Sequence, residues 1–350
     1  MHASAIVADG EFRQANVGSV LGRVVPVALR LFAIIVPPAI ILLVLLASGD
    51  AVFRARVDHL VDTLFSVELA SFIKGSIVTV LSGVVLVGVL ALMSRRREAL
   101  SPNAPKRWLT PLESYALLGT LTSMLLVFGV TSTPCALAPS ACELPAGVTY
   151  ADAAHEGFFQ LLFAAIGILA LTMALPARVQ SQSKGFTAMS TLLVLATAPM
   201  LVSAVARLWR YETTYGLTVL RLMAYAGLFL VAAVLAWRAL TLWVFGEAFV
   251  GGAFAMLTVT LLGLAALSPE DFIARRNVQM DDVDVAYLLA LSDDAVPALV
   301  EARDRLPNPL YLDLKEVLRY RAEKMNGGES WLTWNLGRSR ARAALGTLKP

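Results

Sequence analysis

The sequence predicts an all-α membrane protein, a polytopic bundle of about seven transmembrane helices followed by a small helical soluble domain. First, 57% of its 350 residues are hydrophobic and only 16% are charged, whereas a soluble domain has roughly 45–50% and 25%. Second, the apolar residues form separate runs, each long enough at about 1.5 Å per residue to cross the ~30 Å hydrocarbon layer. Third, these runs stop at residue 267. Beyond that point the composition is that of a soluble protein.

The chain begins with a polar segment, residues 1–23, which lacks the apolar core and small-residue cleavage site of a signal peptide. Pro37 and Pro38 lie inside the first span, where two missing backbone donors predict a bent helix. After it, residues 49–69 have apolar positions at helical spacing, which predicts an amphipathic helix, either at the membrane interface or packed as an ordinary connecting helix. The transmembrane bundle, residues 24–267, has predicted spans at 24–47, 72–93, 112–132, 157–175, 186–206, 216–237 and 248–267.

Lysine and arginine in the short loops predict the orientation, because cytoplasmic loops carry an excess of both. The loop between the second and third spans contains five of them, and the loop at 133–156 contains none. We therefore expect the first loop and the amino terminus in the cytoplasm, and the loop at 133–156 and the carboxyl-terminal domain outside. Arg275 and Arg276 after the last span favour the opposite side, but long segments cross largely regardless of charge.

Cys135 and Cys142, the only cysteines, lie in the loop predicted to be external. An oxidising compartment favours a disulfide between them, which would stabilise this short loop by about 2–3 kcal/mol in the chain-entropy model. Two free thiols are the main alternative, because a metal pair would lack further ligands.

Residues 268–350 predict a domain of about five short helices. Ser268 before Pro269 is typical of a capped helix start. Asp284 is predicted to cap the next helix, and Asp293 or Asp294 the one after it. Further helices are expected over residues 311–325 and 330–345. In the last one, tryptophans and arginines alternate, which fits either a membrane surface or a small core with solvated arginines: Trp331, Trp334, Arg338, Arg340 and Arg342.

Residues 203–222, SAVARLWRYETTYGLTVLRL, carry the densest charge beside two apolar runs. An arginine near hydrocarbon costs about 2.5–3.5 kcal/mol on insertion scales and needs a reason. Arg221 lies about five residues into the sixth span, so its side chain either reaches the headgroups or turns inward to form an ion-paired or ligand-holding cluster. The residues predicted for this external cluster are Arg207, Arg210, Tyr211, Tyr215 and Arg221, with His155, Glu156 and Glu68.

A smaller group of charges lies at the predicted inner ends of the spans: Glu113, Arg238 and Glu247. We expect these residues to pair with one another.

Enzyme motifs are absent: the sequence has no GxxxxGK[ST], GxGxxG, HExxH, CxxC or GxSxG. His155 and Glu156 are the only pair placed for proton chemistry, and an interfacial histidine beside a helix-start glutamate explains them equally simply. We therefore expect no catalytic residue, no cofactor and no metal. The net charge of +3 is too small to predict nucleic-acid binding.

Several segments together resemble a known family. They are GVTYADAAHEGFFQL at 147–161, the stretch at 203–222 with its YGLTVLR, PEDFIARRN at 269–277 and LSDDAVPAL at 291–299. They are similar to an uncharacterised family of bacterial multi-pass membrane proteins that is known only as a domain of unknown function. The resemblance implies a bacterial inner-membrane protein and transfers no activity.

Three function classes remain. The first is a non-catalytic scaffold, regulator or accessory subunit of an inner-membrane complex, which fits the short loops and missing motifs and implies a protein partner or a homo-oligomer. The second is a transporter or channel for a small anionic solute that enters at the arginine cluster. It requires broken helices near the midplane, for which only Pro37, Pro38 and Pro199 are candidates. The third is an enzyme acting on lipid or envelope substrates.

Overall fold

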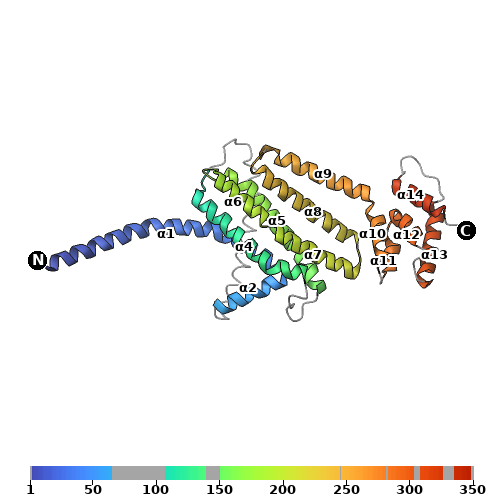
Figure 1. The fold of residues 1–350 in the computed structure, drawn as a ribbon, viewed down its shortest axis with the longest axis horizontal. Coiled ribbons are helices and arrows are strands. Elements are labelled where there is room, and N and C mark those ends of the chain that lie inside the picture. The colour runs from blue at the N-terminus through green and yellow to red at the C-terminus, as the bar shows by residue number, and fades with distance from the viewer. Residues whose placement is uncertain are drawn as a thin grey trace, which may run out of the picture. The chain divides into compact units, whose positions relative to one another are not determined.

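The computed structural model describes residues 2–64, 107–138, 150–244, 246–280, 283–302, 308–325 and 335–347, without the side chains of 2–24, 150–156, 308–313 and 324–325. These residues form helices, and their β-structure is one isolated bridge between Leu109 and Val179 (Figure 1). The all-α class is confirmed.

Six segments of the described chain are long and apolar enough to cross a membrane, so the protein is a multi-pass membrane protein. Each coincides with a predicted span, while the predicted span at 72–93 lies outside the described residues. The six segments are Val25–Gly49, Pro111–Leu137, Gly157–Ala177, Lys184–Tyr215, Val219–Thr241 and Gly246–Leu267.

The chain folds as two compact units. Unit 1 comprises Met1–Val148 and Glu156–Met200, and unit 2 comprises Thr149–His155 and Leu201–Pro350. The last two spans therefore belong with the carboxyl-terminal helices in unit 2.

Unit 1 is built on α1 (His2–Gly49), α2 (Ala51–Leu64), α4 (Pro111–Leu137), most of α5 (Tyr150–Ala174) and α6 (Lys184–Leu195). Helix α1 continues through Pro37 and Pro38. Helix α2 packs against α1 and α4, and its Phe53 is buried with its ring 5.3 Å from that of Phe128. This packing fits the interpretation of α2 as a packed connecting helix, and a position at the membrane interface stays a prediction.

The span at Lys184–Tyr215 is broken near its middle. Helix α6 ends at Leu195 and α7 (Ala198–Tyr215) begins three residues later, with Pro199 in its first turn. Proline is tolerated there because the first-turn N–H groups have no helical partner. Helix α7 continues past the predicted end at residue 206 as far as Tyr215. The charged stretch is therefore helical.

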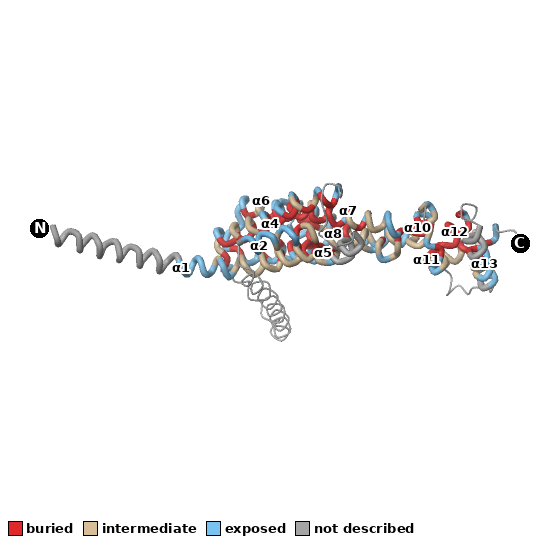
Figure 2. The backbone as a smooth tube through the Cα atoms, turned by 90° about the horizontal axis from the view of Figure 1, so that it is seen from below, coloured by how far each residue is buried: buried red, intermediate tan, exposed pale blue. Residues whose placement is uncertain are grey.

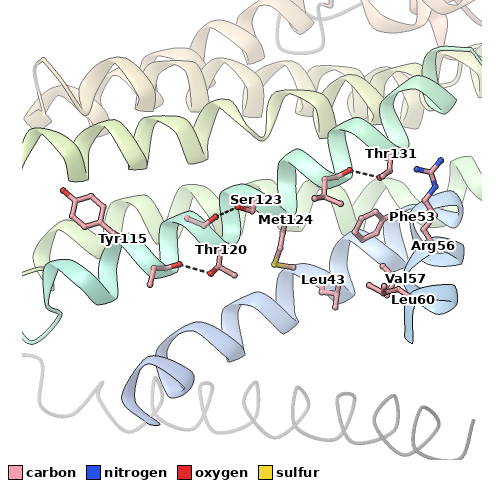
Figure 3. Close-up of a pocket in the computed structure, with 13 residues that line it drawn as sticks. Leu43, Phe53, Arg56, Val57, Leu60, Tyr115, Thr120, Ser123, Met124 and Thr131 are labelled. Atoms are coloured by element: carbon pink, nitrogen blue, oxygen red, sulfur yellow. Dashed lines mark hydrogen bonds between the residues drawn. The ribbon is translucent and has the colours of Figure 1, made fainter. Parts of the chain in front are cut away.

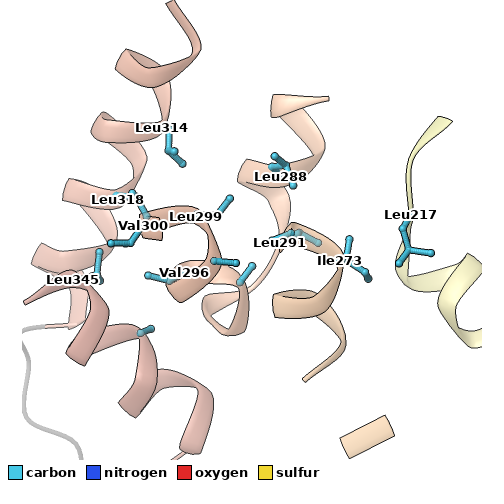
Figure 4. Close-up of a cluster of buried hydrophobic side chains, with 14 of the residues drawn as sticks. Leu217, Ile273, Leu288, Leu291, Val296, Leu299, Val300, Leu314, Leu318 and Leu345 are labelled. Atoms are coloured by element: carbon cyan, nitrogen blue, oxygen red, sulfur yellow. The ribbon is translucent and has the colours of Figure 1, made fainter. Parts of the chain in front are cut away.

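Unit 2 contains most of α7, then α8 (Val219–Thr241), η3 (Gly246–Ala248) and α9 (Phe249–Leu267). The carboxyl-terminal helices are α10 (Pro269–Asn277), α11 (Val285–Ala290), η4 (Asp293–Ala295), α12 (Val296–Ala302), α13 (Asn308–Met325) and α14 (Leu336–Leu345). Buried residues line α10 and α12 (Figure 2). One apolar core contains Leu288, Leu299 and Leu318 from these helices and also Leu217 and Leu222 from the join of α7 and α8 (Figure 4).

Of the predicted helix caps in this region, only Asp284 is confirmed: its Oδ1 accepts the Tyr287 N–H at 2.9 Å. The cap at Ser268 was wrong. With no linker between α9 and α10, Ser268 ends one helix and begins the next, in a left-handed conformation with φ 49° that forms no side-chain cap. The caps at Asp293 or Asp294 were also wrong, because both lie inside η4, which Ser292 caps.

Candidate functional site

The charged stretch ends in a sharp turn, residues 215–221, which we call the corner. Helix α7 ends at Tyr215, and Gly216 follows with φ 76°. Its N–H donates to the Glu212 carbonyl at 2.8 Å, as in a helix that ends on a left-handed glycine. Thr218 caps α8, accepting the Arg221 N–H at 3.4 Å. The corner thus connects two membrane helices through three non-helical residues, 216–218.

Gly216→Ala tests the corner's backbone geometry. A left-handed alanine costs roughly 1–2 kcal/mol, and its Cβ would lie 3.3 Å from both Asn277 Oδ1 and Met280 Sδ. We expect the thermal unfolding midpoint in detergent to fall by several degrees. The control is Gly227→Ala in α8, where a Cβ meets no atom within 4 Å. An unchanged midpoint for Gly216→Ala would contradict the assigned turn.

Arg221 folds back onto the corner. One guanidinium nitrogen donates to the carbonyl oxygens of Tyr215, at 3.0 Å, and Gly216. The guanidinium also lies 4.1 Å from the ring centre of Tyr211. The ring centres of Tyr211 and Tyr215 are 4.9 Å apart. The last carbonyls of a helix lack backbone partners and favour a cation. In the described chain Arg221 therefore caps the end of α7.

Glu212 is the only acidic residue in the stretch at 203–222, and it connects three helices of unit 2, α7, α8 and α10. Its Oε2 accepts the Tyr225 hydroxyl of α8 at 2.8 Å, and its Oε1 lies 3.3 Å from Nε of Arg276 in α10. The Glu212 side chain is 12% exposed. A carboxylate this far removed from water needs such partners to remain charged.

Asn277 holds the corner to α10. Its buried amide accepts the Leu217 N–H at 2.7 Å and donates to the Leu217 carbonyl at 2.8 Å. We call this pair of bonds the amide clamp. Tyr287 adds a further contact, because its hydroxyl accepts the Val219 N–H at 3.1 Å. Buried backbone groups outside helices must find such partners. The carboxyl-terminal helices supply them here.

Arg275, next to Arg276 in α10, makes its contacts with other residues of the carboxyl-terminal helices. It donates to Asp271 at 2.9 Å and to Glu301 of α12. Both hydrogen bonds raise the pKa of the Arg275 guanidinium, and the one to Glu301 has the larger effect. The adjacent arginines therefore divide their roles: Arg275 joins α10 to α12, and Arg276 joins α10 to α7.

The structure brings together only part of the predicted external cluster. Tyr211, Tyr215 and Arg221 are in contact, whereas Arg207 donates to Ser203 Oγ at 3.1 Å, one turn earlier on α7. Arg210 also makes an interaction of its own. Glu68 lies outside the described residues, and the side chains of His155 and Glu156 do too. Their predicted pairing with the arginines stays a prediction.

Glu113, one of the predicted inner group, has a partner that the prediction did not name. This residue is buried in unit 1, where its carboxylate lies 2.7 Å from Nε of Arg30 and accepts the Thr110 N–H at 2.8 Å. Arg30, on α1, also donates to the Trp108 carbonyl. The prediction overlooked Arg30 because it considered only charges at the span ends. Arg30 lies within an apolar run and pairs across helices.

The other two members of the inner group belong to unit 2. Arg238 is buried in α8, 5.3 Å from the ring centre of Phe249. Glu247 is exposed in η3. Among the described residues, no three histidine, cysteine or acidic side chains are grouped to hold a metal ion.

Sequence reasoning missed Glu212, Tyr225, Arg276, Asn277 and Tyr287 as parts of this site. A usable signal existed for Glu212, the only acid in the charged stretch, and for Arg276, which directly precedes Asn277 in the PEDFIARRN motif. Tyr225 and Tyr287 carried none, because aromatic residues are ordinary at helical positions in both segments.

Residues 16–302 match the family described as Domain of unknown function (DUF4153). The chain belongs to this family. The match confirms the resemblance to an uncharacterised family, and the DUF4153 region includes the corner, Asn277 and Tyr287 but ends before α13. No curated protein and no solved structure matches the chain.

Proposed function

We propose that the protein is a non-catalytic scaffold or accessory subunit of a bacterial inner-membrane complex, which holds its carboxyl-terminal helical domain in a fixed position for a partner. The observation that carries this proposal is the amide clamp between Asn277 and Leu217. It ties the domain to the non-helical residues that join two membrane helices, where the backbone groups would otherwise lack partners.

The continuous core of unit 2 supports the same function. Leu217 and Leu222 of the corner are buried in one cluster with Ile273, Leu288 and Leu299 of the domain. A domain on a flexible tether would not share a core with its membrane helices, because interfaces between mobile domains are smaller and more polar. A domain held in one position suits a binding surface that a partner protein recognises in one orientation.

The contacts of the arginines favour the scaffold over an entrance for anions. Arg221 donates to backbone carbonyls, and Arg276 pairs with Glu212. Binding an anion there would require these bonds to be broken first, which reduces the affinity by the same free energy. The broken span at Pro199 is the remaining feature of the transporter alternative. The enzyme alternative rests on His155 and Glu156, whose side chains lie outside the described residues.

The test is purification in a mild detergent from the native membrane. A scaffold should copurify with one protein in stoichiometric amount, or as a homo-oligomer of defined size, and Asn277→Leu should reduce the recovery of a protein partner. A monomer that moves a small anion across liposome membranes, with a flux that Arg221→Gln abolishes, would instead establish the transporter.

We further propose the orientation inferred from the charged loops, with the carboxyl-terminal domain and the predicted loop at 133–156 outside. The structure places Cys135 in the last turn of α4 rather than in a loop. Cys142 lies outside the described residues, so the Cys135–Cys142 disulfide stays a prediction. Intact cells treated with a membrane-impermeant maleimide should label this loop only after reduction, and intact-mass analysis should show two added labels. Labelling without reduction would contradict the disulfide. Labelling only after the cells are opened would reverse the orientation.

A further inference from the structure

A groove in unit 1 is lined by residues of α1, α2 and α4, and none of the contacts above fills it. It has a volume of about 700 Å³, within the roughly 300–1,000 Å³ typical of ligand sites. Figure 3 shows it running along α4 from Tyr115 to Thr131, with Leu43 of α1 and Arg56 of α2 beside it. A ligand of this shape would be long and narrow.

The wall of the groove is apolar in effect, although several of its residues carry hydroxyl groups. Thr120, Ser123 and Thr131 each donate to a carbonyl of α4 one turn earlier, at 2.8 Å. Their hydrogens are thus used within the helix. A small polar solute would lose its hydration and gain few bonds in return, whereas a hydrocarbon chain loses nothing. The lining therefore selects an apolar chain.

Arg56 places a cation at one end of this apolar groove. Its side chain is exposed, and it makes no hydrogen bond or ion pair within the described chain. Arg54, two residues earlier, differs because it donates to the carbonyls of Ala47 and Ser48 at the end of α1. A guanidinium with all its donors available is suited to a phosphate group, which it binds by charge-assisted hydrogen bonds.

We propose that the groove binds an anionic phospholipid, with one acyl chain along α4 and the phosphate against Arg56. The occupant follows from the two ends of the groove. An apolar groove with one cation at its end is complementary to an amphiphile that carries its charge at one end of an apolar chain. This inference is independent of the proposed scaffold, because the groove lies in unit 1 and the amide clamp in unit 2.

The experiment is a lipid titration followed by native mass spectrometry, on the full chain purified and delipidated in a nonionic detergent. Phosphatidylglycerol is the probe, and diacylglycerol with the same acyl chains is the comparison without phosphate. We expect Arg56→Gln to weaken phosphatidylglycerol binding about tenfold or more, as for a charge-assisted hydrogen bond. It should leave diacylglycerol binding unchanged. Ser123→Phe, which fills the groove, should weaken both.

Two matched controls separate the site from general effects of charge and size. Arg319→Gln removes an exposed arginine of α13, and Leu126→Phe adds an aromatic ring to an exposed position of α4 outside the groove. Both should bind as the unaltered protein does. Equal phosphatidylglycerol affinity for Arg56→Gln and the unaltered protein would overturn the phosphate contact. Unaltered binding by Ser123→Phe would overturn the acyl site.

A second measurement asks whether protein rather than lipid fills the groove. Met124 lines it, so Met124→Cys in a chain without Cys135 and Cys142 introduces a thiol there. In the delipidated protein this thiol should react with an apolar maleimide, and added phosphatidylglycerol should protect it. A thiol that stays unreactive without lipid would show that another part of the chain covers the groove and would overturn the proposal.

Discussion

Asn277→Leu is expected to release the carboxyl-terminal domain from the corner while leaving the membrane spans folded. The substitution removes both bonds of the amide clamp and leaves the buried N–H and carbonyl of Leu217 without their partner. Each unsatisfied group costs about 1–3 kcal/mol. We therefore expect about 2–4 kcal/mol less stability for the docked state. Hydrogen exchange should quicken at Leu217, Val219 and α10.

Two comparison variants make this result specific. Asn277→Asp keeps the acceptor for the Leu217 N–H but loses the donor, so it should have an intermediate effect. Asn335→Ala removes another asparagine of the same domain, one whose side chain caps α14. Loss of that cap should cost about 1 kcal/mol and leave exchange at Leu217 unchanged. Equal effects of Asn277→Leu and Asn335→Ala would mean that the clamp does not hold the domain.

Arg30→Leu is expected to give the largest loss of stability in unit 1. It removes the cation that lies 2.7 Å from Glu113, a carboxylate with only 5% side-chain exposure. Breaking a fully buried pair costs about 3–5 kcal/mol. Because the Arg30 side chain is 47% exposed, solvent already weakens this pair, and we expect about 2 kcal/mol. The measurement is thermal or denaturant unfolding in detergent, followed by a probe in unit 1.

The double variant Arg30→Leu with Glu113→Gln tests the cause of that loss. A neutral glutamine can still accept the Thr110 N–H, so it removes the unpaired charge and should restore much of the stability. Arg178→Leu is the control, because Arg178 is exposed and its described bonds involve only its backbone. It should change the stability by less than about 0.5 kcal/mol. A loss for Arg30→Leu that Glu113→Gln does not relieve would contradict the ion pair.

The membrane spans could be predicted from the sequence because the bilayer imposes a simple requirement. Every backbone group in hydrocarbon must be bonded within its own helix, so each span has to be a long apolar run. The predicted ends of the spans were less exact where a charged stretch directly follows an apolar run. The span that begins at Lys184 was predicted to end at residue 206, because the sequence becomes charged there, yet α7 continues to Tyr215. Arg207 and Arg210 are therefore helical residues, and Arg207 donates to Ser203 one turn earlier.

The site could be predicted only as far as its residues are neighbours in sequence. Tyr211 and Tyr215 are four positions apart, so a continuing helix places them on one face. Asn277 and Leu217 are separated by 60 residues, and no periodicity connects them. Their pairing depends on Gly216, which turns the chain so that the Leu217 backbone faces α10. The left-handed turn could have been expected from a glycine after a helix, but not its partner.

The corner shows which partners the charges of this stretch have in the described chain. Arginines beside hydrocarbon suggested a ligand site, because each needs a compensating partner. In the folded chain the partners of Arg221 are the carbonyls that end α7 and the ring of Tyr211, and Glu212 pairs with Arg276 of α10. The charges therefore stabilise a turn and a docked domain. The groove with the available arginine lies elsewhere, at Arg56, which composition alone did not distinguish from its neighbours.

The central claim, that the carboxyl-terminal domain is held in one position on its membrane helices, can be measured directly. Spin labels at Leu220 of α8 and Tyr320 of α13, both exposed, would report the distance between them in lipid nanodiscs, in a chain whose two native cysteines are serine. We predict a single narrow distance distribution that Asn277→Leu broadens. A broad or multiple distribution in the chain that retains Asn277 would show a mobile domain and contradict the scaffold.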